Sequence, residues 1–276
     1  MGSVAYNYKG DVVVITGAGS GIGKGTALEF AKAGASIAIC DVNLEAAEKT
    51  AEECRALTSG KVIAVKMDVT NDEEISAAKD AILKEMGTVD ILFSNAGVSS
   101  KVMGPPLESI PNSDWELVLQ VNTLGMVKVC RTFAPIFKEK RAGKIVMTSS
   151  IAAYTSTPRS MQYSVSKLAT IGFAHAFSIE MGEYNVNVNT ICPGFVYTNI
   201  YADGTGMKFR NAIGGPLLKF TDNESVMNAM AAAGSSLRRA QKVEDMAYAV
   251  LFLCSDQAKE ITGQVLNVDS GYVNRI

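Results

Sequence analysis

Tyr163 and Lys167 are the residues of this chain whose types and spacing point most directly to chemistry. They stand four positions apart in the run Tyr163-Ser164-Val165-Ser166-Lys167, so on a helix their side chains share one face. A phenol held beside an ammonium forms an acid–base pair, because the positive charge favours the phenolate. Ser150, thirteen residues before Tyr163, adds a hydroxyl. Taken singly, Lys167 could be a solvated surface charge and Ser150 could cap a strand.

A glycine-rich turn near the start of the chain, Thr16-Gly17-Ala18-Gly19-Ser20-Gly21-Ile22-Gly23, indicates nucleotide binding. Such a turn between a strand and a helix lets the backbone approach a diphosphate, which then lies at the positive helix end. The turn does not match GxGxxG in any frame and follows Thr-Gly-x3-Gly-x-Gly instead. A plain strand–helix turn would not need Gly17, Gly21 and Gly23 together. The turn and the Tyr163–Lys167 pair therefore predict hydride transfer between a nicotinamide and an alcohol or ketone.

Asp41 indicates which dinucleotide binds. It ends a predicted strand 18 residues after the last glycine of the turn, where a carboxylate can bond the adenosine ribose hydroxyls and repel a 2′-phosphate. Val42 follows it and Ser20 lies in the glycine turn, so neither position near that phosphate is basic. We expect NAD to be preferred over NADP. Asp68, which ends the next predicted strand, could hydrogen-bond adenine or simply cap a turn.

The composition is that of an ordinary globular protein, with 276 residues, 47% hydrophobic and 20% charged, and a formal net charge of −2. That charge offers no basic surface for nucleic acid. The longest apolar run, Met246–Cys254, is far shorter than the roughly 18 residues that span a membrane, and the N-terminus lacks signal-peptide features. We expect no nucleic-acid or membrane partner.

The cysteines and the lone histidine argue against metal or redox chemistry. Five scattered cysteines without paired spacing are typical of inert core residues in a reduced, cytoplasmic protein. His175 is the only histidine, so an HExxH zinc motif is excluded. We interpret His175 as a packing or interface residue and expect no metal.

Apolar runs alternate with helical stretches along almost the whole chain. Strands are predicted at Val12–Thr16, Ser36–Asp41, Val62–Asp68, Val89–Ser94, Lys144–Ser149, Val186–Cys192 and Val265–Val268. Helices are predicted at Gly21–Ala33, Leu44–Leu57, Asp72–Met86, Asp114 to about Lys140, Ser160–Gly182 and Val243–Cys254. Continuous β-branched runs between helices indicate an α/β fold, a doubly wound Rossmann-type parallel sheet of seven strands with helices on both faces.

No linker or repeat divides the chain, so we expect one Rossmann-fold domain over residues 1–276. One segment, 199–237, is rich in glycine and apolar residues and breaks the strand–helix alternation. Because it follows a strand, we expect it to cover the carboxyl edge as a substrate lid. The alternative is a surface excursion with small helices of its own.

An ordered set of motifs resembles the compact, single-domain type of the short-chain dehydrogenase/reductase family, from about Lys9 to Tyr272. The set is Thr16-Gly17-x3-Gly21-x-Gly23, Asp68-Val69, Asn95-Ala96-Gly97, Asn122, Ser150, Tyr163-x3-Lys167, Pro193-Gly194-x3-Thr198 and Thr262–Asp269. Ser94 and Ser270 depart from the family, which often has asparagine and glycine there, and neither touches the chemistry.

The resemblance implies a catalytic set of Asn122, Ser150, Tyr163 and Lys167. Tyr163 would be the acid–base group; because free tyrosine has a pKa of about 10, Lys167 and the oxidised nicotinamide would together lower it toward neutrality. Lys167 would also bind the nicotinamide ribose. Ser150 would hydrogen-bond the substrate oxygen, and Asn122 would hold a water that links Lys167 to solvent.

The residues expected to contact NAD combine the glycine turn and Asp41 with positions that the resemblance implies. They are Gly17, Ser20, Gly21, Ile22, Gly23, Asp41, Val42, Asp68, Val69, Asn95, Ala96, Gly97, Tyr163, Lys167, Pro193, Gly194, Val196 and Thr198.

The substrate pocket is expected to combine Ser150 and Tyr163 with the stretches 152–154 and 98–103 and with the lid. The substrate residues named are Ser150, Ala152, Tyr163, Ile200 and Met207. Apolar lid residues favour a secondary alcohol or ketone with a hydrophobic body, such as a hydroxysteroid, bile acid or cyclic ketone. Polyols, 3-oxoacyl thioesters, a dehydratase or double-bond reductase, and a non-catalytic NAD-binding protein stay open.

The resemblance also implies a homotetramer or homodimer, built by the helices that carry Asn122 and Tyr163.

Overall fold

The fold was analysed in a computed structural model that describes residues 4–155, 160–198 and 205–273. The described strands form one parallel sheet in the order β3-β2-β1-β4-β5-β6-β7. They are β1 Val12–Thr16, β2 Ser36–Asp41, β3 Val62–Lys66, β4 Ile91–Ser94, β5 Gly143–Thr148, β6 Val186–Pro193 and β7 Val265–Val268. The predicted doubly wound seven-stranded sheet is confirmed.

The strand order changes direction between β1 and β4. β1 pairs with β2 on one side and with β4 on the other, so the crossovers leaving β1 and β4 diverge. In such sheets a crevice opens at this point, outside the carboxyl ends of the strands. The ends of β1, β2, β4, β5 and β6 therefore surround one hollow.

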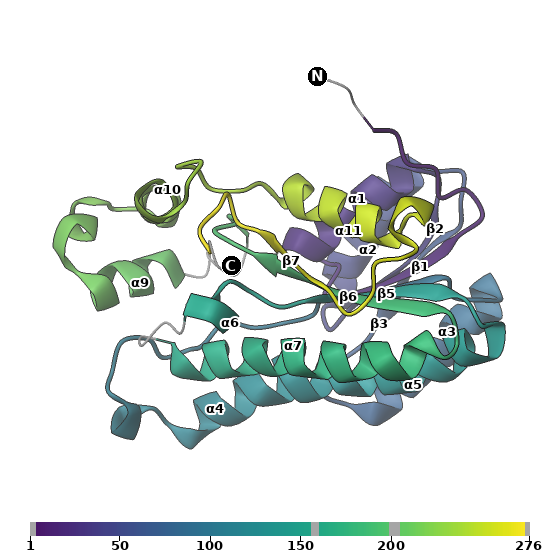
Figure 1. Cartoon of the computed structure of the whole chain (residues 1–276), viewed down its shortest axis with the longest axis horizontal. Helices are drawn as coiled ribbons and strands as arrows, with labels where there is room; N and C mark the ends of the chain where they lie inside the picture. The colour runs from purple at the N-terminus through teal and green to yellow at the C-terminus, as the bar shows by residue number, and fades with distance from the viewer. Residues whose placement is uncertain (1–3, 156–159, 199–204, 274–276) are drawn as a thin grey trace.

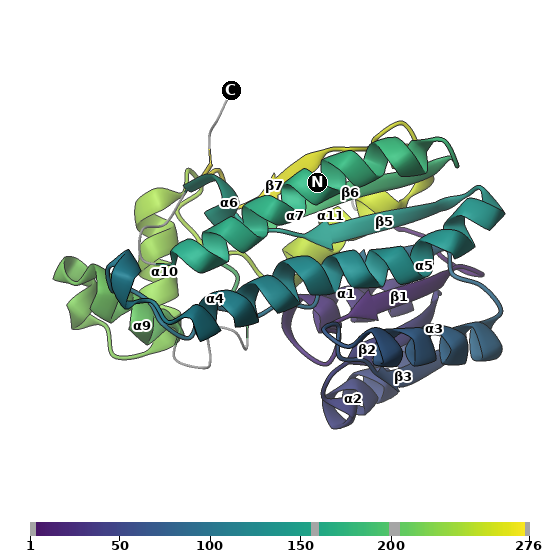
Figure 2. The same cartoon turned by 90° about the horizontal axis from the view of Figure 1, so that it is seen from below.

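Helices cover both faces of the sheet, as Figures 1 and 2 show. One layer contains α1 Gly21–Lys32, α2 Leu44–Arg55 and α11 Val243–Cys254, and the other contains α3 Asp72–Met86, α4 Asn112–Leu119, α5 Met126–Lys140 and α7 Met161–Gly182. Each layer closes its own apolar core, one including Phe30 and Leu251 and the other Phe133 and Phe177. This two-sided burial explains why the strands read as continuous apolar runs.

The helices differ in how their first turns are capped. The Asn43 side chain accepts from Ala46 N–H at the start of α2, and Asn71 accepts from Glu73 and Glu74 N–H at the start of α3. Ser20, at the start of α1, makes no side-chain cap bond, and no acidic residue stands in the first turn of α1. The N–H groups of this helix end are thus left for another acceptor.

The predicted helix from Asp114 to Lys140 is not continuous, which corrects the sequence interpretation. Between α4 and α5 the chain forms a π-helical segment, η2, over Gln120–Gly125. Single π-turns inside α-helices are rare and often lie at functional sites. Here the wider turn contains Asn122, which is completely buried. The strand predicted at Val89 begins at Ile91, and other boundaries shift by one or two residues.

The segment between β6 and α11 forms helices of its own and projects beyond one end of the sheet (Figure 1). They are α9 Thr205–Ile213, η3 Gly215–Lys219 and α10 Asn223–Gly234. α10 packs through Met227 and Ala231 onto Ile151 and Phe195, beside the short helix α6 Ala152–Thr155. The remaining short turns are η1 Leu107–Ser109 and η4 Asp256–Ala258.

All five cysteines are free and buried, as predicted for core residues. Within the described residues, no helix has the length and apolarity needed to cross a bilayer.

Candidate active site

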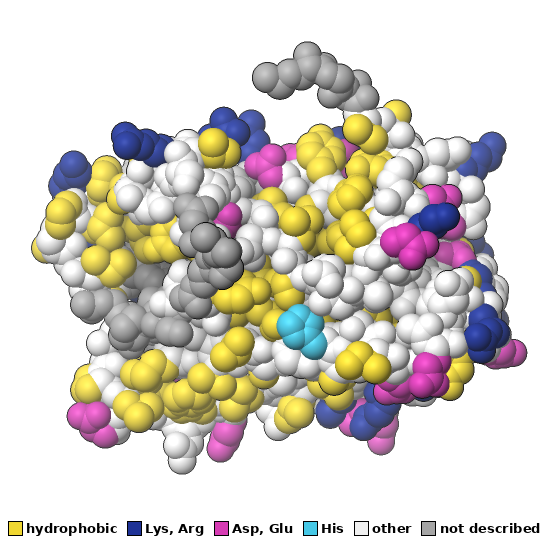
Figure 3. All heavy atoms as spheres, in the orientation of Figure 1, with side chains coloured by type: hydrophobic (Ala, Val, Ile, Leu, Met, Phe, Trp, Pro, Cys, Tyr) yellow, Lys and Arg dark blue, Asp and Glu magenta, His cyan; other side chains and the backbone are white. Residues whose placement is uncertain are grey.

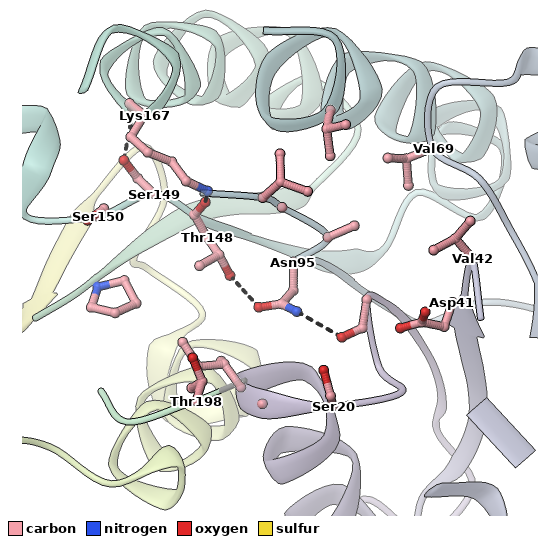
Figure 4. A pocket seen from close by; sticks show the side chains of 18 of the residues that line it. Ser20, Asp41, Val42, Val69, Asn95, Thr148, Ser149, Ser150, Lys167 and Thr198 are labelled. Atoms are coloured by element: carbon pink, nitrogen blue, oxygen red, sulfur yellow. Dashed lines mark hydrogen bonds between the residues drawn. The ribbon is translucent and has the colours of Figure 1, made fainter. Parts of the chain in front are cut away.

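A cavity of about 480 Å³ lies at the carboxyl ends of β1, β2, β4, β5 and β6. Figure 4 shows side chains from these strand ends and from α7 converging on it. The predicted residues that line it are Gly17, Ser20, Gly21, Ile22, Asp41, Val42, Asp68, Val69, Asn95, Ala96, Gly97, Ser150, Tyr163, Lys167, Pro193, Gly194, Val196 and Thr198. The structure thus gathers residues from most of the chain around one hollow.

The glycine turn lies unusually close to its neighbours. Gly17 has φ +65°, and a Cβ there would stand 2.8 Å from the Cα of Ala96. A Cβ at Gly23 would stand 2.2 Å from the carbonyl oxygen of Gly17, so only glycine lets α1 start this close to the turn. Gly23 does not line the cavity, which refines the prediction: it lets the turn close, and the cavity wall comes from Gly17, Gly21 and Ile22.

Asp41 is held at the end of β2 by two backbone donors. Gly19 N–H donates to Oδ2 at 2.9 Å and Asn43 N–H donates to Oδ1 at 2.9 Å. These bonds fix the carboxylate against the glycine turn and leave each oxygen a further lone pair. Besides Asp41, the charged side chains that line the cavity in the described part of the chain are Asp68 and Lys167. A 2′-phosphate near Asp41 would therefore meet a carboxylate and no described lysine or arginine.

Asp68 caps a turn, which is one of the two roles that its type suggested. Its Oδ1 accepts from the Thr70 N–H at 2.8 Å and the Thr70 hydroxyl at 2.7 Å, which caps the turn after β3. The residue also lines the cavity beside Val69. The turn cap and an adenine contact are therefore compatible.

Asn95 ties three strand ends together below the cavity. Its Nδ2 donates to the Thr16 carbonyl at 3.1 Å and its Oδ1 accepts from the Thr148 hydroxyl at 3.1 Å. Its backbone N–H donates to the Thr16 hydroxyl at 3.0 Å. The ends of β1, β4 and β5 are thus fixed relative to one another, as seen in part in Figure 4.

Tyr163 and Lys167 lie together on α7, as their spacing predicted. The Lys167 ammonium stands 5.7 Å from the centroid of the Tyr163 ring. The Lys167 ammonium also donates to the Thr148 carbonyl at 2.9 Å, and this bond fixes the lysine side chain at the cavity wall (Figure 4). Lys167 is 3% exposed, whereas Tyr163 is half-buried.

Burial dominates the protonation of this pair. It raises the pKa of Tyr163 to about 12, and a hydrogen bond with Ser150 offsets only part of that rise. Burial likewise lowers the pKa of Lys167 to about 8. Lys167 alone therefore does not bring the phenol toward neutrality. The expectation that the oxidised nicotinamide supplies a second positive charge stays a prediction.

Ser150 follows β5 and lines the cavity beside Tyr163. Its hydroxyl accepts from the Ala152 N–H at 3.1 Å, which fixes the side chain at the start of α6. The neighbouring Ser149 hydroxyl points the other way and donates to the Lys167 carbonyl at 2.7 Å (Figure 4). The two serines thus have separate tasks, one facing the cavity and one bracing α7.

Asn122 does not line the cavity but organises the chain next to it. Its Oδ1 accepts from Val98 N–H at 2.8 Å, and its Nδ2 donates to the Val98 carbonyl at 3.0 Å and to Ser166 Oγ at 3.1 Å. Its side chain therefore joins the loop after β4 to α7. The expected water between Asn122 and Lys167 stays a prediction.

Two expected substrate residues, Ala152 and Met207, do not line the cavity. Ala152 begins α6 and contacts Ser150 through its N–H, while Met207 lies half-buried on α9 with its N–H donating to Asn223 Oδ1 at 2.9 Å. Ile200 lies outside the described residues. Val98, from the expected stretch 98–103, lines the cavity. The sequence interpretation missed other lining residues, namely Met67, Thr70, Leu117, Val121, Thr148 and Ser149. Thr148 and Ser149 could have been found, because they end a strand just before Ser150.

The residues present fit a nicotinamide dinucleotide. The uncapped N-terminus of α1 suits a diphosphate, and Asp41 suits the adenosine ribose. Thr198 lies close to the glycine turn, because a Cβ at Gly21 would stand 3.3 Å from the Thr198 Cβ. Lys167 is the cationic side chain of the described cavity wall. The cavity thus runs from the Asp41 carboxylate to the Tyr163–Lys167 pair.

Comparisons with known proteins agree with this geometry. A family model described as enoyl-(acyl carrier protein) reductase matches residues 17–273. The chain is 31% identical to the 3-oxoacyl-[acyl-carrier-protein] reductase FabG of Thermotoga maritima, covering 96% of this chain and 98% of that protein. It is 32% identical to the 7alpha-hydroxysteroid dehydrogenase of Escherichia coli K12, covering 97% and 96%.

A solved structure of a 7α-hydroxysteroid dehydrogenase, complexed with NADH and 7-oxo glycochenodeoxycholic acid, has a similar fold. It superimposes with a TM-score of 0.83 at 30% identity, over 98% of this chain and 97% of that chain.

Proposed function

Since the chain belongs to the short-chain dehydrogenase/reductase family, we propose that it interconverts a secondary alcohol and a ketone with NAD. The family assignment makes it an oxidoreductase of CH–OH groups that uses NAD or NADP. The observation that carries the finer proposal is the meeting of Ser150, Tyr163 and Lys167 in the cavity that Asp41 closes at its other end. The intact set favours carbonyl chemistry over a dehydratase, a double-bond reductase or a non-catalytic binding protein, a choice that the fold alone does not make.

The chain's own residues divide the proton chemistry among them. In oxidation, Tyr163 Oη would take the alcohol proton, and in reduction it would return it to the ketone oxygen. Ser150 Oγ would hydrogen-bond that same oxygen, and Lys167 would supply positive charge near the phenol. NAD, when bound, supplies the hydride acceptor or donor.

Asp41 supports NAD over NADP. Its carboxylate is fixed by Gly19 and Asn43, and Val42 beside it is 61% exposed and apolar. A 2′-phosphate carries about −1.5 to −2 charge at neutral pH and would lie against this carboxylate. The NADH bound in the 7α-hydroxysteroid dehydrogenase structure is consistent with this preference.

The segment after β6 supports a substrate with an apolar body. α10 packs onto Ile151, the residue after Ser150, and α9 lies next to Gly104, where an added Cβ would stand 2.9 Å from the Ala212 Cβ. We propose that the described part of this segment, 205–237, covers the substrate end of a single catalytic domain. The similarity to a hydroxysteroid dehydrogenase favours hydroxysteroids or bile acids; the similarity to a 3-oxoacyl reductase supports thioesters as the second candidate.

A panel of substrates tests the proposed reaction. We expect NAD-dependent NADH formation with hydroxysteroids, bile acids or cyclic secondary alcohols, at a kcat/KM at least tenfold above that with polyols. Matched ketones should oxidise NADH in reverse, and 3-oxoacyl thioesters serve as the competing class. Activity confined to polyols would contradict the apolar substrate, and no turnover of any alcohol or ketone would contradict the reaction itself.

An exposed apolar stripe on α7 supports a homo-oligomer. Its positions Val165, Leu168, Gly172, His175 and Ile179 alternate in steps of three and four, the spacing of a helix-pairing seam. Val165, Leu168 and Ile179 are 47%, 53% and 77% exposed. Figure 3 shows the His175 ring at the surface with hydrophobic side chains on either side. We propose that α7 pairs with its copy in a homodimer or homotetramer, where His175 would be the predicted interface residue.

Replacing Ile179 by aspartate should break that pairing. The change places a charge in the seam of both copies, far along α7 from Tyr163, and we expect the dissociation constant to rise by about tenfold or more. Light scattering after size exclusion reports the mass. Tyr248→Asp is the matched control, because Tyr248 is 52% exposed on α11 in the opposite layer. A monomeric wild type, or dissociation by the control alone, would contradict the seam.

A further inference from the structure

A buried carboxylate, Asp114 on α4, lies beside the site and takes no part in lining the cavity. It is 3% exposed. Its described hydrogen bonds come from uncharged N–H donors, and no described lysine or arginine forms an ion pair with it. Buried carboxylates are rare unless they are paired with a cation or hold several donors. The groups that donate hydrogen bonds to Asp114 therefore indicate its structural role.

Those donors all belong to a loop and to the helix that carries Tyr163. Oδ1 accepts from the Lys101 N–H at 2.8 Å, and Oδ2 accepts from the Val102 N–H at 3.3 Å. Oδ2 also accepts from Gln162 Nε2 at 2.6 Å. Gln162 Nε2 in turn donates to the Val102 carbonyl at 3.1 Å. Asp114 and Gln162 thus hold three backbone groups of residues 101 and 102.

The same loop is tied at two further points. Ser100 and Ser160, both buried, form a hydroxyl–hydroxyl bond of 2.8 Å, which joins the loop to the residue before α7. At its start, Val98 is bonded through N–H and C=O to Asn122. The loop 98–103 is therefore fixed by side chains from α4, η2 and the first turn of α7.

The loop connects the acid–base pair to the substrate end. Val98 lines the cavity, and a Cβ at the preceding Gly97 would stand 3.4 Å from Lys167 Nζ. Just beyond the loop, Gly104 contacts Ala212 of α9. A substrate bonded to Tyr163 and extending toward α9 would pass along this loop.

Gln162 is oriented by Asp114 rather than by its other surroundings. Its Oε1 is buried without a hydrogen-bond partner among the described residues, while Nε2 makes two bonds. A buried, unpaired amide oxygen is costly, so the two Nε2 bonds must outweigh it. Hydrogen bonds to an ionised carboxylate are about twice as strong as neutral ones, which supplies that excess.

We propose that Asp114 and Gln162 are positioning residues that hold loop 98–103 against α7 and thereby set the affinity for substrate, not for cofactor. The affinity part of this proposal rests on the proposed alcohol–ketone function. The restraint on loop 98–103 does not depend on that function, so an experiment can contradict one part of the proposal without the other.

Limited proteolysis tests the restraint without any activity assay. Lys101 is exposed, but the backbone on both sides of its scissile bond is held by Asp114 and Gln162. We expect trypsin to cut after Lys101 at least tenfold faster in Asp114→Asn and in Gln162→Met than in the wild type. Asp245→Asn is the matched control, because it removes a carboxylate that accepts from the Lys242 N–H at the far helix α11.

Steady-state kinetics test the effect on substrate. Losing a hydrogen bond to a charged group weakens the equilibrium that depends on it by roughly tenfold to hundredfold. We therefore expect the substrate KM to rise about tenfold or more in Asp114→Asn. The dissociation constant for NAD should stay within about twofold, because the backbone groups that the two residues hold, at Lys101 and Val102, are not among the expected NAD contacts.

Exchanging the carboxylate and the amide between positions 114 and 162 separates the loss of this contact from a general loss of stability. Gln162→Glu alone places two carboxylates together and should raise the substrate KM further. Combining it with Asp114→Asn restores one carboxylate and one amide, and we expect at least tenfold recovery of KM relative to Gln162→Glu alone.

The proposal is overturned if Asp114→Asn leaves both the Lys101 cleavage rate and the substrate KM unchanged. It is also overturned if NAD binding weakens as much as substrate binding, or if the exchange gives no recovery. If the wild type turns over no alcohol or ketone, the proposed function fails, and the cleavage rates alone then decide whether the loop is restrained.

Discussion

Replacing Tyr163 by phenylalanine should lower kcat for alcohol oxidation by about 10²- to 10⁴-fold, the usual contribution of a positioned acid–base group. The ring stays, so the packing of this half-buried side chain on α7 is preserved. The phenol oxygen, which bonds Ser150 and is the proposed proton acceptor, is lost. The dissociation constant for NAD, measured by fluorescence quenching or calorimetry, should change less than about threefold. Retained turnover with unchanged NAD binding would exclude Tyr163 as the acid–base group.

The same residue predicts the direction of the pH dependence. Burial raises the pKa of Tyr163 to about 12 in the cofactor-free chain, so its phenol is protonated at neutral pH. Oxidation needs the phenolate and should speed up as pH rises; reduction needs the phenol and should slow. The slope should disappear in Tyr163→Phe. A wild-type oxidation rate that does not depend on pH between about 6 and 9 would argue against this assignment.

Replacing Asp41 by asparagine should change the cofactor preference. Two unit charges about 4 Å apart near a protein surface interact by about 4 kcal/mol, so the wild type should favour NAD over NADP by roughly 10²-fold or more in kcat/KM. Asparagine keeps the size of the side chain and one acceptor oxygen but removes the charge. The preference should then fall below about tenfold, through weaker use of NAD and better use of NADP.

Asp68→Asn is the control for this change, because Asp68 also lines the cavity but bonds Thr70 at the turn after β3. It should leave the ratio of the two cofactors within about threefold of the wild type. If the wild type uses NADP as well as NAD, or if Asp68→Asn shifts the ratio as much as Asp41→Asn, Asp41 is not the discriminating residue.

Residues at strand ends were the part of the site that sequence could predict. A parallel sheet brings the carboxyl ends of its strands to one edge, so Asp41, Asn95 and Ser150 had to gather there once the strands were assigned. The i, i+4 spacing then placed Tyr163 and Lys167 on one helix face. The fold and the cofactor cavity follow from these local patterns because each strand is a short buried run with a clear end.

Contacts between segments far apart in the chain could not be predicted in this way. The π-helical turn contains Asn122, whose side chain bonds Val98, 24 residues earlier. Asp114 bonds Lys101 in a loop and Gln162 on a helix, 13 and 48 residues away. Neither pairing follows from periodicity or local propensity. The protonation of Tyr163 was equally hidden, since burial, which raises its pKa, is a property of the packed site.

A crystal structure with NAD and a turned-over alcohol, or its ketone, would test the proton-transfer assignment most directly. We expect the substrate oxygen to lie about 2.6–3.2 Å from both Tyr163 Oη and Ser150 Oγ, with Asp41 bonded to the adenosine ribose. A substrate oxygen bonded to neither hydroxyl, or a dinucleotide bound away from the glycine turn, would contradict it.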